Sequence, residues 1–164
     1  MIVEFCQWLG QTRLSITIQS VSWVVPTVQT IHILCVALIV THSAMLDLRL
    51  IGIAGKGRSI ARMTRDAMPW IWNALKVLAA TGTILIIAEP ARELTNAAFW
   101  LKMSLLVVGI ALTALVQRGV GKNEDYWESS ASRRRVASVV ATVSILVWVC
   151  VASAGRWIGY VQHD

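Results

Sequence analysis

Three ionisable side chains stand out inside long apolar stretches of this sequence: His32, Lys76 and Lys102. Ionisable groups at membrane depth are costly, and they commonly face a cavity, a cofactor or each other. A neutral imidazole can ligate a metal, and an ammonium group can neutralise a carboxylate of a bound molecule. These residues are therefore the first candidates for chemistry.

His32 and Lys102 are expected to lie at a similar depth in two different helices. Counted from Pro26 and from Ala97, which we take as outer ends, each lies on the order of 8 to 9 Å below the surface. Gln29 precedes His32 by about one helical turn, so it could orient the imidazole or bond a ligand. The sequence predicts a cofactor-binding site formed by His32, Lys102 and Gln29, in which His32 is the metal ligand.

Each of these candidates also has a purely structural interpretation. His32 could hydrogen-bond a neighbouring carbonyl or hydroxyl group and hold two helices together. The ammonium group of Lys102 could extend to the outer interface, and that of Lys76 to the inner one. The residue types alone leave both interpretations open.

The other two histidines are weaker candidates. His42 follows His32 by ten residues, which places it about 80° away around a helix of 3.6 residues per turn. Two stacked haems on one helix would need both histidines at nearly the same angle, so a two-haem cytochrome is disfavoured. We expect His42 to pack near Asp47 at the inner end, where Asp47 and Arg49 form a local ion pair or contact lipid. We expect His163 to lie in a solvated tail.

The composition identifies the elements that must position these side chains. Only 15% of the residues are charged and 56% are apolar, whereas about a quarter of a soluble domain is charged. No Asp, Glu, Lys or Arg occurs between Arg13 and Asp47, or between Arg135 and Arg156. Runs of this length predict membrane spans, and the motifs of common soluble enzymes are missing from the sequence.

The sequence predicts four spans, near residues 22–46, 69–89, 97–117 and 136–158. Each is long enough to cross about 30 Å of hydrocarbon. Because lipid offers no hydrogen bonds to bare backbone, and because the runs do not alternate with period two, the spans are helices. The expected fold is an all-α integral membrane four-helix bundle, forming a single transmembrane domain over residues 1–164.

A short helix in the outer interface is expected before the first span. Ile2, Phe5, Cys6 and Leu9 recur at helical spacing, which predicts one apolar face. Pro26 suits the first turn of the first span or a kink in it.

The basic residues are unevenly distributed between the two sides of the predicted bundle. Ten belong to the first and third links: Arg49, Lys56, Arg58, Arg62, Arg65, Arg118, Lys122, Arg133, Arg134 and Arg135. The positive-inside rule then predicts that both termini lie outside and that both long links are cytoplasmic. Anionic headgroups of the lipid bilayer account for the net charge of +6, and no nucleic-acid partner is expected.

Two stretches of the chain resemble known membrane families. Val28–Leu50, VQTIHILCVALIVTHSAMLDLRL, resembles the first span of the HemJ-type protoporphyrinogen oxidases and of the CopD-like copper-resistance domains. The stretch from Phe99, FWLKMSLLVVGIALTAL, is similar to the HemJ-type span in which a Lys near the helix start faces that His. The DLRL motif at Asp47 to Leu50, with Gly52, is closer still to a bacterial family of unknown function.

The resemblance implies a haem b held in the bundle, with His32 as axial ligand and Lys102 as its companion. The resemblance to bacterial proteins also implies a bacterial inner membrane, with both termini periplasmic. The first span lacks the Tyr-Leu-Pro-Arg pattern of HemJ-type proteins, so porphyrinogen oxidation is not carried over. A copper function is not carried over either, because the chain has no Met-rich or His-rich cluster.

Two hypotheses of function follow from the sequence. The first is a small membrane redox protein that binds haem b and acts in electron transfer or as an oxidoreductase subunit. The alternative is a non-catalytic membrane anchor, an assembly subunit or a small-solute channel, in which His32 and the lysines bind a partner or line a polar path. In either case we expect a homo-oligomer or a membrane or periplasmic redox partner.

Overall fold

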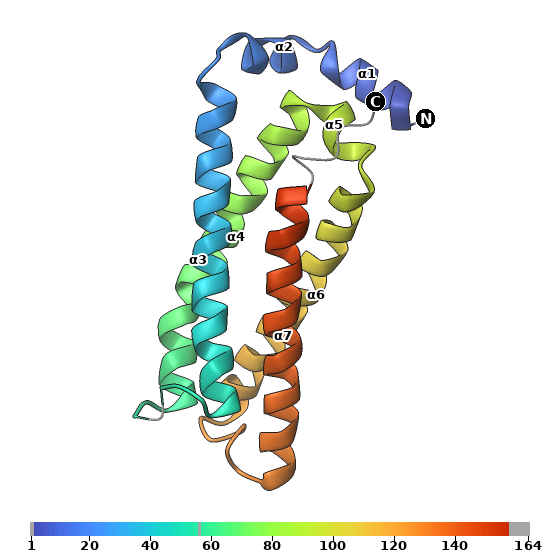
Figure 1. The fold of residues 1–164 in the computed structure, drawn as a ribbon. Coiled ribbons are helices and arrows are strands. Elements are labelled where there is room, and N and C mark those ends of the chain that lie inside the picture. Colours follow the sequence, from blue (N-terminus) through green and yellow to red (C-terminus); the bar gives the residue numbers. More distant parts are fainter. Residues whose placement is uncertain (1, 56, 158–164) are drawn as a thin grey trace.

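The computed structural model describes residues 2–55 and 57–157 and is dominated by four long helices (Figure 1). These are α3 (Val24–Ile51), α4 (Ile60–Ala88), α6 (Ala97–Lys122) and α7 (Ala131–Trp157). All four are long and apolar enough to cross a membrane. The predicted all-α four-helix bundle is confirmed, and the described part of the chain contains no strand.

Three short helices lie at one end of the bundle, which we call the cap end (Figure 1). They are α1 (Ile2–Gly10), α2 (Arg13–Ser20) and α5 (Pro90–Leu94). The opposite end, which we call the link end, carries the connections 52–59 and 123–130. The predicted short N-terminal helix is confirmed as α1, whereas α2 was not expected.

Side chains of the N-terminal segment fasten it to the bundle. Cys6 is buried, and its thiol donates to the carbonyl of Pro90 over 3.5 Å. The side chain of Thr12 caps α2 by accepting from the amide of Ser15. The Gln19 amide donates to the carbonyl of Ala88 over 2.6 Å, which satisfies one of the carbonyl groups left free at the end of α4.

The helices extend beyond the predicted spans at the link end. Helix α4 begins at Ile60, where the Ser59 side chain accepts from the amide of Arg62, and it continues through Pro69. Helix α7 begins at Ala131 rather than near residue 136. Hydropathy detects only the apolar stretch that lipid requires, so it misses polar helical turns outside the hydrocarbon. Pro26 lies in the first turn of α3, as expected.

The four long helices do not contact one another equally. Helix α3 packs along α4 and α7, and α6 packs along α7, whereas α4 and α6 share a much smaller contact. Ile39 of α3 and Ile71 of α4 are fully buried where these helices meet. Large apolar side chains on the outer faces, such as Leu34 and Val107, are exposed, as expected for helices surrounded by lipid.

Two tryptophans pack against glycines of α6. Trp148 is buried, and a Cβ added at Gly109 would lie 3.1 Å from its ring. Trp127 is also buried, and its indole N–H donates to the carbonyl of Val116 over 3.1 Å. Because Gly119 has no side chain, the Trp127 ring can lie directly against the α6 backbone.

Candidate functional site

His32 lies between α3 and α4 in the cap-end half of the bundle. Its Nδ1 atom is 2.9 Å from the hydroxyl oxygen of Thr81 on α4. A Cβ added at the next residue, Gly82, would lie 3.4 Å from Cε1 of the ring. Because Gly82 has no side chain, the imidazole lies directly against the α4 backbone.

The hydrogen bonds of Thr81 determine which nitrogen of His32 carries the proton. The Thr81 hydroxyl donates to the carbonyl of Val77 over 2.8 Å, within its own helix. Since a hydroxyl group has one proton, the Thr81 oxygen can only accept from His32, which assigns the proton to Nδ1. The Nε2 atom of the neutral ring is then left with a lone pair.

Lys102, which lies on α6, contacts that lone pair. Its Nζ atom lies 3.3 Å from Nε2 of His32. The lysine side chain passes close to Gly155 of α7, where an added Cβ would lie 3.6 Å from Nζ. The two residues meet, as their predicted depths suggested, and the ammonium group points into the bundle rather than out to the interface.

Glu93 of α5 adds a carboxyl group near Lys102. Burial raises the pKa of Glu93 above its ordinary value, and the positive charges of Lys102 and Arg92 oppose that rise. Arg92 also forms an ion pair with Glu89. The cap end thus places the imidazole of His32 and the ammonium group of Lys102 in contact, with the Glu93 carboxyl group within electrostatic range of Lys102, and the three groups come from three different helices.

The remaining sequence candidates lie apart from this site. The side chain of Gln29 is exposed, and it makes none of the side-chain hydrogen bonds found among the described residues. Lys76 is exposed and donates to the side chain of Asn73 over 3.4 Å. His42 donates from Nδ1 to the carbonyl of Leu38 over 2.9 Å, and its ring stacks on a tryptophan of α4. His163 lies outside the described residues.

The residues at the cap end suit a haem better than a bare metal ion. Among the described residues, no group of three or more His, Cys, Asp or Glu side chains could hold an ion. His32 offers one nitrogen lone pair, Lys102 would offer a second once its ammonium group lost its proton, and a porphyrin would bring the other four donors. The donor types therefore fit a haem iron, and Gly82 and Gly155 are the residues of α4 and α7 that lie against the two side chains.

A second polar cluster, which the sequence analysis missed, lies in the link-end half. Asp47 of α3 is only 3% exposed, and Ser144 of α7 makes a side-chain hydrogen bond to its carboxyl group. The predicted pairing of Asp47 with Arg49 is wrong. Asp47 and Arg49 are two positions apart and therefore point to different faces of α3. Arg49 instead forms an ion pair with Glu128 at 3.0 Å.

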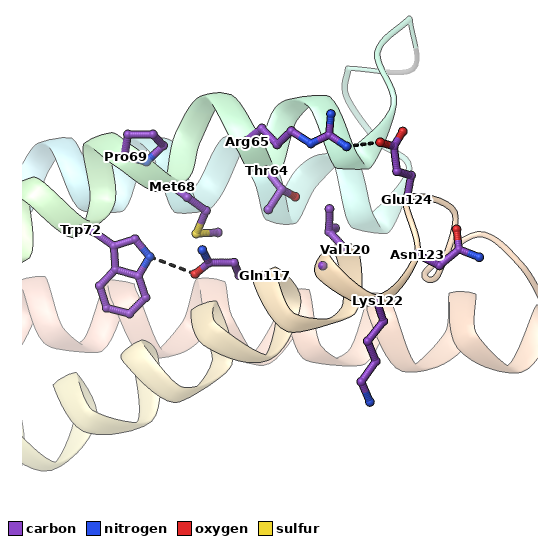
Figure 2. Close-up of a pocket in the computed structure, with 11 residues that line it drawn as sticks. Thr64, Arg65, Met68, Pro69, Trp72, Gln117, Val120, Lys122, Asn123 and Glu124 are labelled. Carbon is purple, nitrogen blue, oxygen red and sulfur yellow. Dashed lines mark hydrogen bonds and ion pairs between the residues drawn. The ribbon is translucent and has the colours of Figure 1, made fainter.

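An open crevice of about 630 Å³ lies at the link end, where α4 and α6 have their small contact (Figure 2). A hydrogen bond of 3.0 Å from the indole of Trp72 to the side chain of Gln117 crosses it. The ion pair between Arg65 and Glu124 lies at its rim (Figure 2). None of the sequence-predicted site residues lines this crevice.

The comparisons with known proteins identify a family without assigning an activity. A model described as a family of unknown function (DUF6644) matches residues 5–161. No curated protein and no solved structure matches the chain, and the comparisons give no evidence for the resemblance to HemJ-type or CopD-like proteins. By a match that covers nearly its whole length, the chain belongs to the DUF6644 family.

Proposed function

We propose that this protein is a small membrane redox protein that binds haem b in the cap-end half of its bundle. One observation carries the proposal. The lone pair on Nε2 of His32, which comes from α3, faces the Nζ atom of Lys102, which comes from α6, at 3.3 Å. A lone pair of this kind, held inside a bundle, is a suitable axial ligand for iron.

Each of the surrounding residues has a defined task in this proposal. Thr81 accepts the Nδ1–H of His32 and so fixes both the tautomer and the orientation of the ring, as the hydrogen-bond partners of metal-bound histidines do. Lys102 would hold the group either as a neutral amine that has lost its proton and coordinates the iron, or as an ammonium group that neutralises a haem carboxylate. Haem would supply one-electron chemistry, and the burial and charge around it would set its potential.

The separation of the two nitrogens indicates which side chain must adapt. The two nitrogens are 3.3 Å apart, so one of the side chains would have to move for a group to be held between them. His32 is fixed by Thr81 and by its contact with Gly82. Lys102 has a long unbranched stem, so it is the residue that we expect to move.

The placement in the membrane is part of the proposal. Arg58, Arg62, Arg65 and Lys122 belong to the link end, and the positive-inside rule favours the cytoplasm for such an end. In a bacterial inner membrane the cap end would then face the periplasm. A redox partner would approach the haem from the periplasm or from within the membrane.

An absorption spectrum of the protein purified in detergent, after expression with adequate haem, tests the proposal. We expect a Soret band that is lost or shifted in His32→Ala and retained in His42→Ala, the matched control from the same helix. A second pair compares Lys102→Met, which should alter the band, with Lys76→Met, which should not. A wild type without the band would favour the alternative function of a non-catalytic anchor, assembly subunit or channel.

A further inference from the structure

The cavity beside Asp47 is lined by polar groups from three helices. Ser43 and Asp47 come from α3, Thr113 from α6 and Ser144 from α7. The cavity has a volume of about 10 Å³, close to the space that one water molecule needs. The side chains of Asp47 and Ser43 are only 3% and 2% exposed. This is therefore an interior site, separate from the open crevice between α4 and α6.

No positive charge compensates Asp47 in this cavity. Apart from Asp47, the described residues that line it are uncharged on every helix, including Leu46 of α3, Ile71 of α4 and Val116 of α6. The nearest arginine along the chain, Arg49, is engaged by Glu128 and by the carbonyl of Arg58. An ionised carboxylate without a partner is very costly in an apolar interior, and a proton removes that cost.

The hydrogen bonds around the cavity also leave a place for a proton on Asp47. Its Oδ2 atom and the Oγ atom of Ser43 have no hydrogen-bond partner among the described residues. Thr113 cannot donate to the carboxyl group, because its hydroxyl proton is used by the carbonyl of Gly109 at 2.9 Å. Ser144 supplies one hydrogen bond to the carboxyl group. A protonated Oδ2 would turn an unsatisfied acceptor into a donor that faces hydroxyl oxygens.

We propose that Asp47 is a proton-binding site in the link-end half of the bundle. The carboxyl group is held as the neutral acid, and its Oδ2–H bond points into the cavity toward Ser43, directly or through one water molecule. The same arrangement satisfies both groups that otherwise lack partners. This proposal does not depend on haem, because none of its residues contacts His32 or Lys102.

Infrared spectroscopy of the purified protein in lipid nanodiscs tests the proposal directly. At neutral pH we expect a C=O stretching band of a protonated carboxyl group that shifts in deuterated buffer. The band should be lost in Asp47→Asn and retained in Asp66→Asn, whose side chain is exposed on α4. A wild type without this band, or a band that survives in Asp47→Asn, would overturn the proposal.

Two further measurements keep the test informative if Asp47→Asn folds poorly. Ser43→Ala retains the carboxyl group and removes its expected acceptor, so the band should remain and shift in frequency; an unshifted band would contradict the assigned direction of the proton. Exchanging sodium for choline at constant ionic strength should leave the unfolding temperature unchanged. A sodium-specific rise would show that a metal cation, rather than a proton, neutralises Asp47.

Discussion

The site at His32 and the cavity at Asp47 lie in opposite halves of the bundle, about 22 Å apart along α3. At the cap end, His32, Lys102 and Glu93 are partly buried groups of complementary chemistry, and the first two hydrogen-bond each other. In the link-end half, Asp47 is buried more completely and has no ionic partner among the residues that line its cavity. Both regions are polar, but only the cap end has charges that can balance one another.

The glycines of the two halves also differ in what they contact. At the cap end, Gly82 and Gly155 lie beside the proposed ligands. In the link-end half, Gly119 lies beside the buried ring of Trp127, whose indole N–H donates to α6. The difference indicates that small residues serve the proposed binding site at one end and close packing at the other.

The largest effect is expected from Gly119→Ala, which tests the packing role of the link-end half. The added Cβ would lie 2.5 Å from the Trp127 ring, closer than real contacts allow. Overpacking of this kind costs about 1 to 3 kcal/mol of unfolding free energy. Thermal unfolding should show the loss, and Gly121→Ala, where the added Cβ would meet no atom within 4 Å, should not. Equal unfolding temperatures for Gly119→Ala and Gly121→Ala would contradict the packing role of Gly119.

Thr81→Val tests whether the cap end is organised around the tautomer of His32. The valine has nearly the same shape but cannot accept the Nδ1–H, so haem affinity should fall roughly ten- to hundred-fold. Thr83→Val is the matched control, because Thr83 is exposed and its hydroxyl donates to the carbonyl of Ala79. Similar haem affinities for both variants would mean that Thr81 does not position the ring.

A smaller effect is expected from Gly82→Ala. The new methyl group would contact His32 at 3.4 Å, which displaces the ring slightly without blocking the fold. We expect haem affinity to fall about threefold, which corresponds to roughly 0.7 kcal/mol, with little change in unfolding temperature. A loss of stability as large as that of Gly119→Ala would show that the cap-end glycine also serves packing.

The smallest effect concerns the pH dependence of stability at the cap end. Burial raises the pKa of Glu93, although Lys102 and Arg92 oppose the rise, so folding favours the protonated acid. The contribution of protonated Glu93 to the free energy of unfolding is complete below the ordinary carboxyl pKa of about 4.3. It is lost as the pH rises through the raised pKa of Glu93. The wild type should therefore lose stability across that window, and Glu93→Gln should not. Glu124→Gln, at the link end, should behave like the wild type.

Much of the fold could be predicted because lipid imposes simple rules on sequence. Long uncharged runs located the four spans, and ionisable residues within them identified His32 and Lys102. Thr81 could not be singled out, because many hydroxyl groups in these spans only donate to the preceding turn, as Thr64 and Thr113 do. The role of a hydroxyl group depends on the neighbouring helix, which the sequence does not specify.

Other differences arise from burial that depends on how the helices pack. Asp47 was assigned to the inner rim because it lies near the end of a span and close to Arg49, yet α3 continues beyond it and turns it inward. Tryptophan is a typical residue of the membrane interface, yet Trp127 is buried, because Gly119 lets its ring lie against α6. Gln29 shares the stripe of His32 by spacing, but the neighbouring helices leave it exposed.

Titration of the purified apoprotein with hemin tests the central proposal most directly, because it measures stoichiometry without relying on haem supply in the cell. We expect one haem per chain for the wild type and for His42→Ala, and no saturable binding for His32→Ala. Saturable binding of the same stoichiometry and affinity in His32→Ala would contradict the proposal.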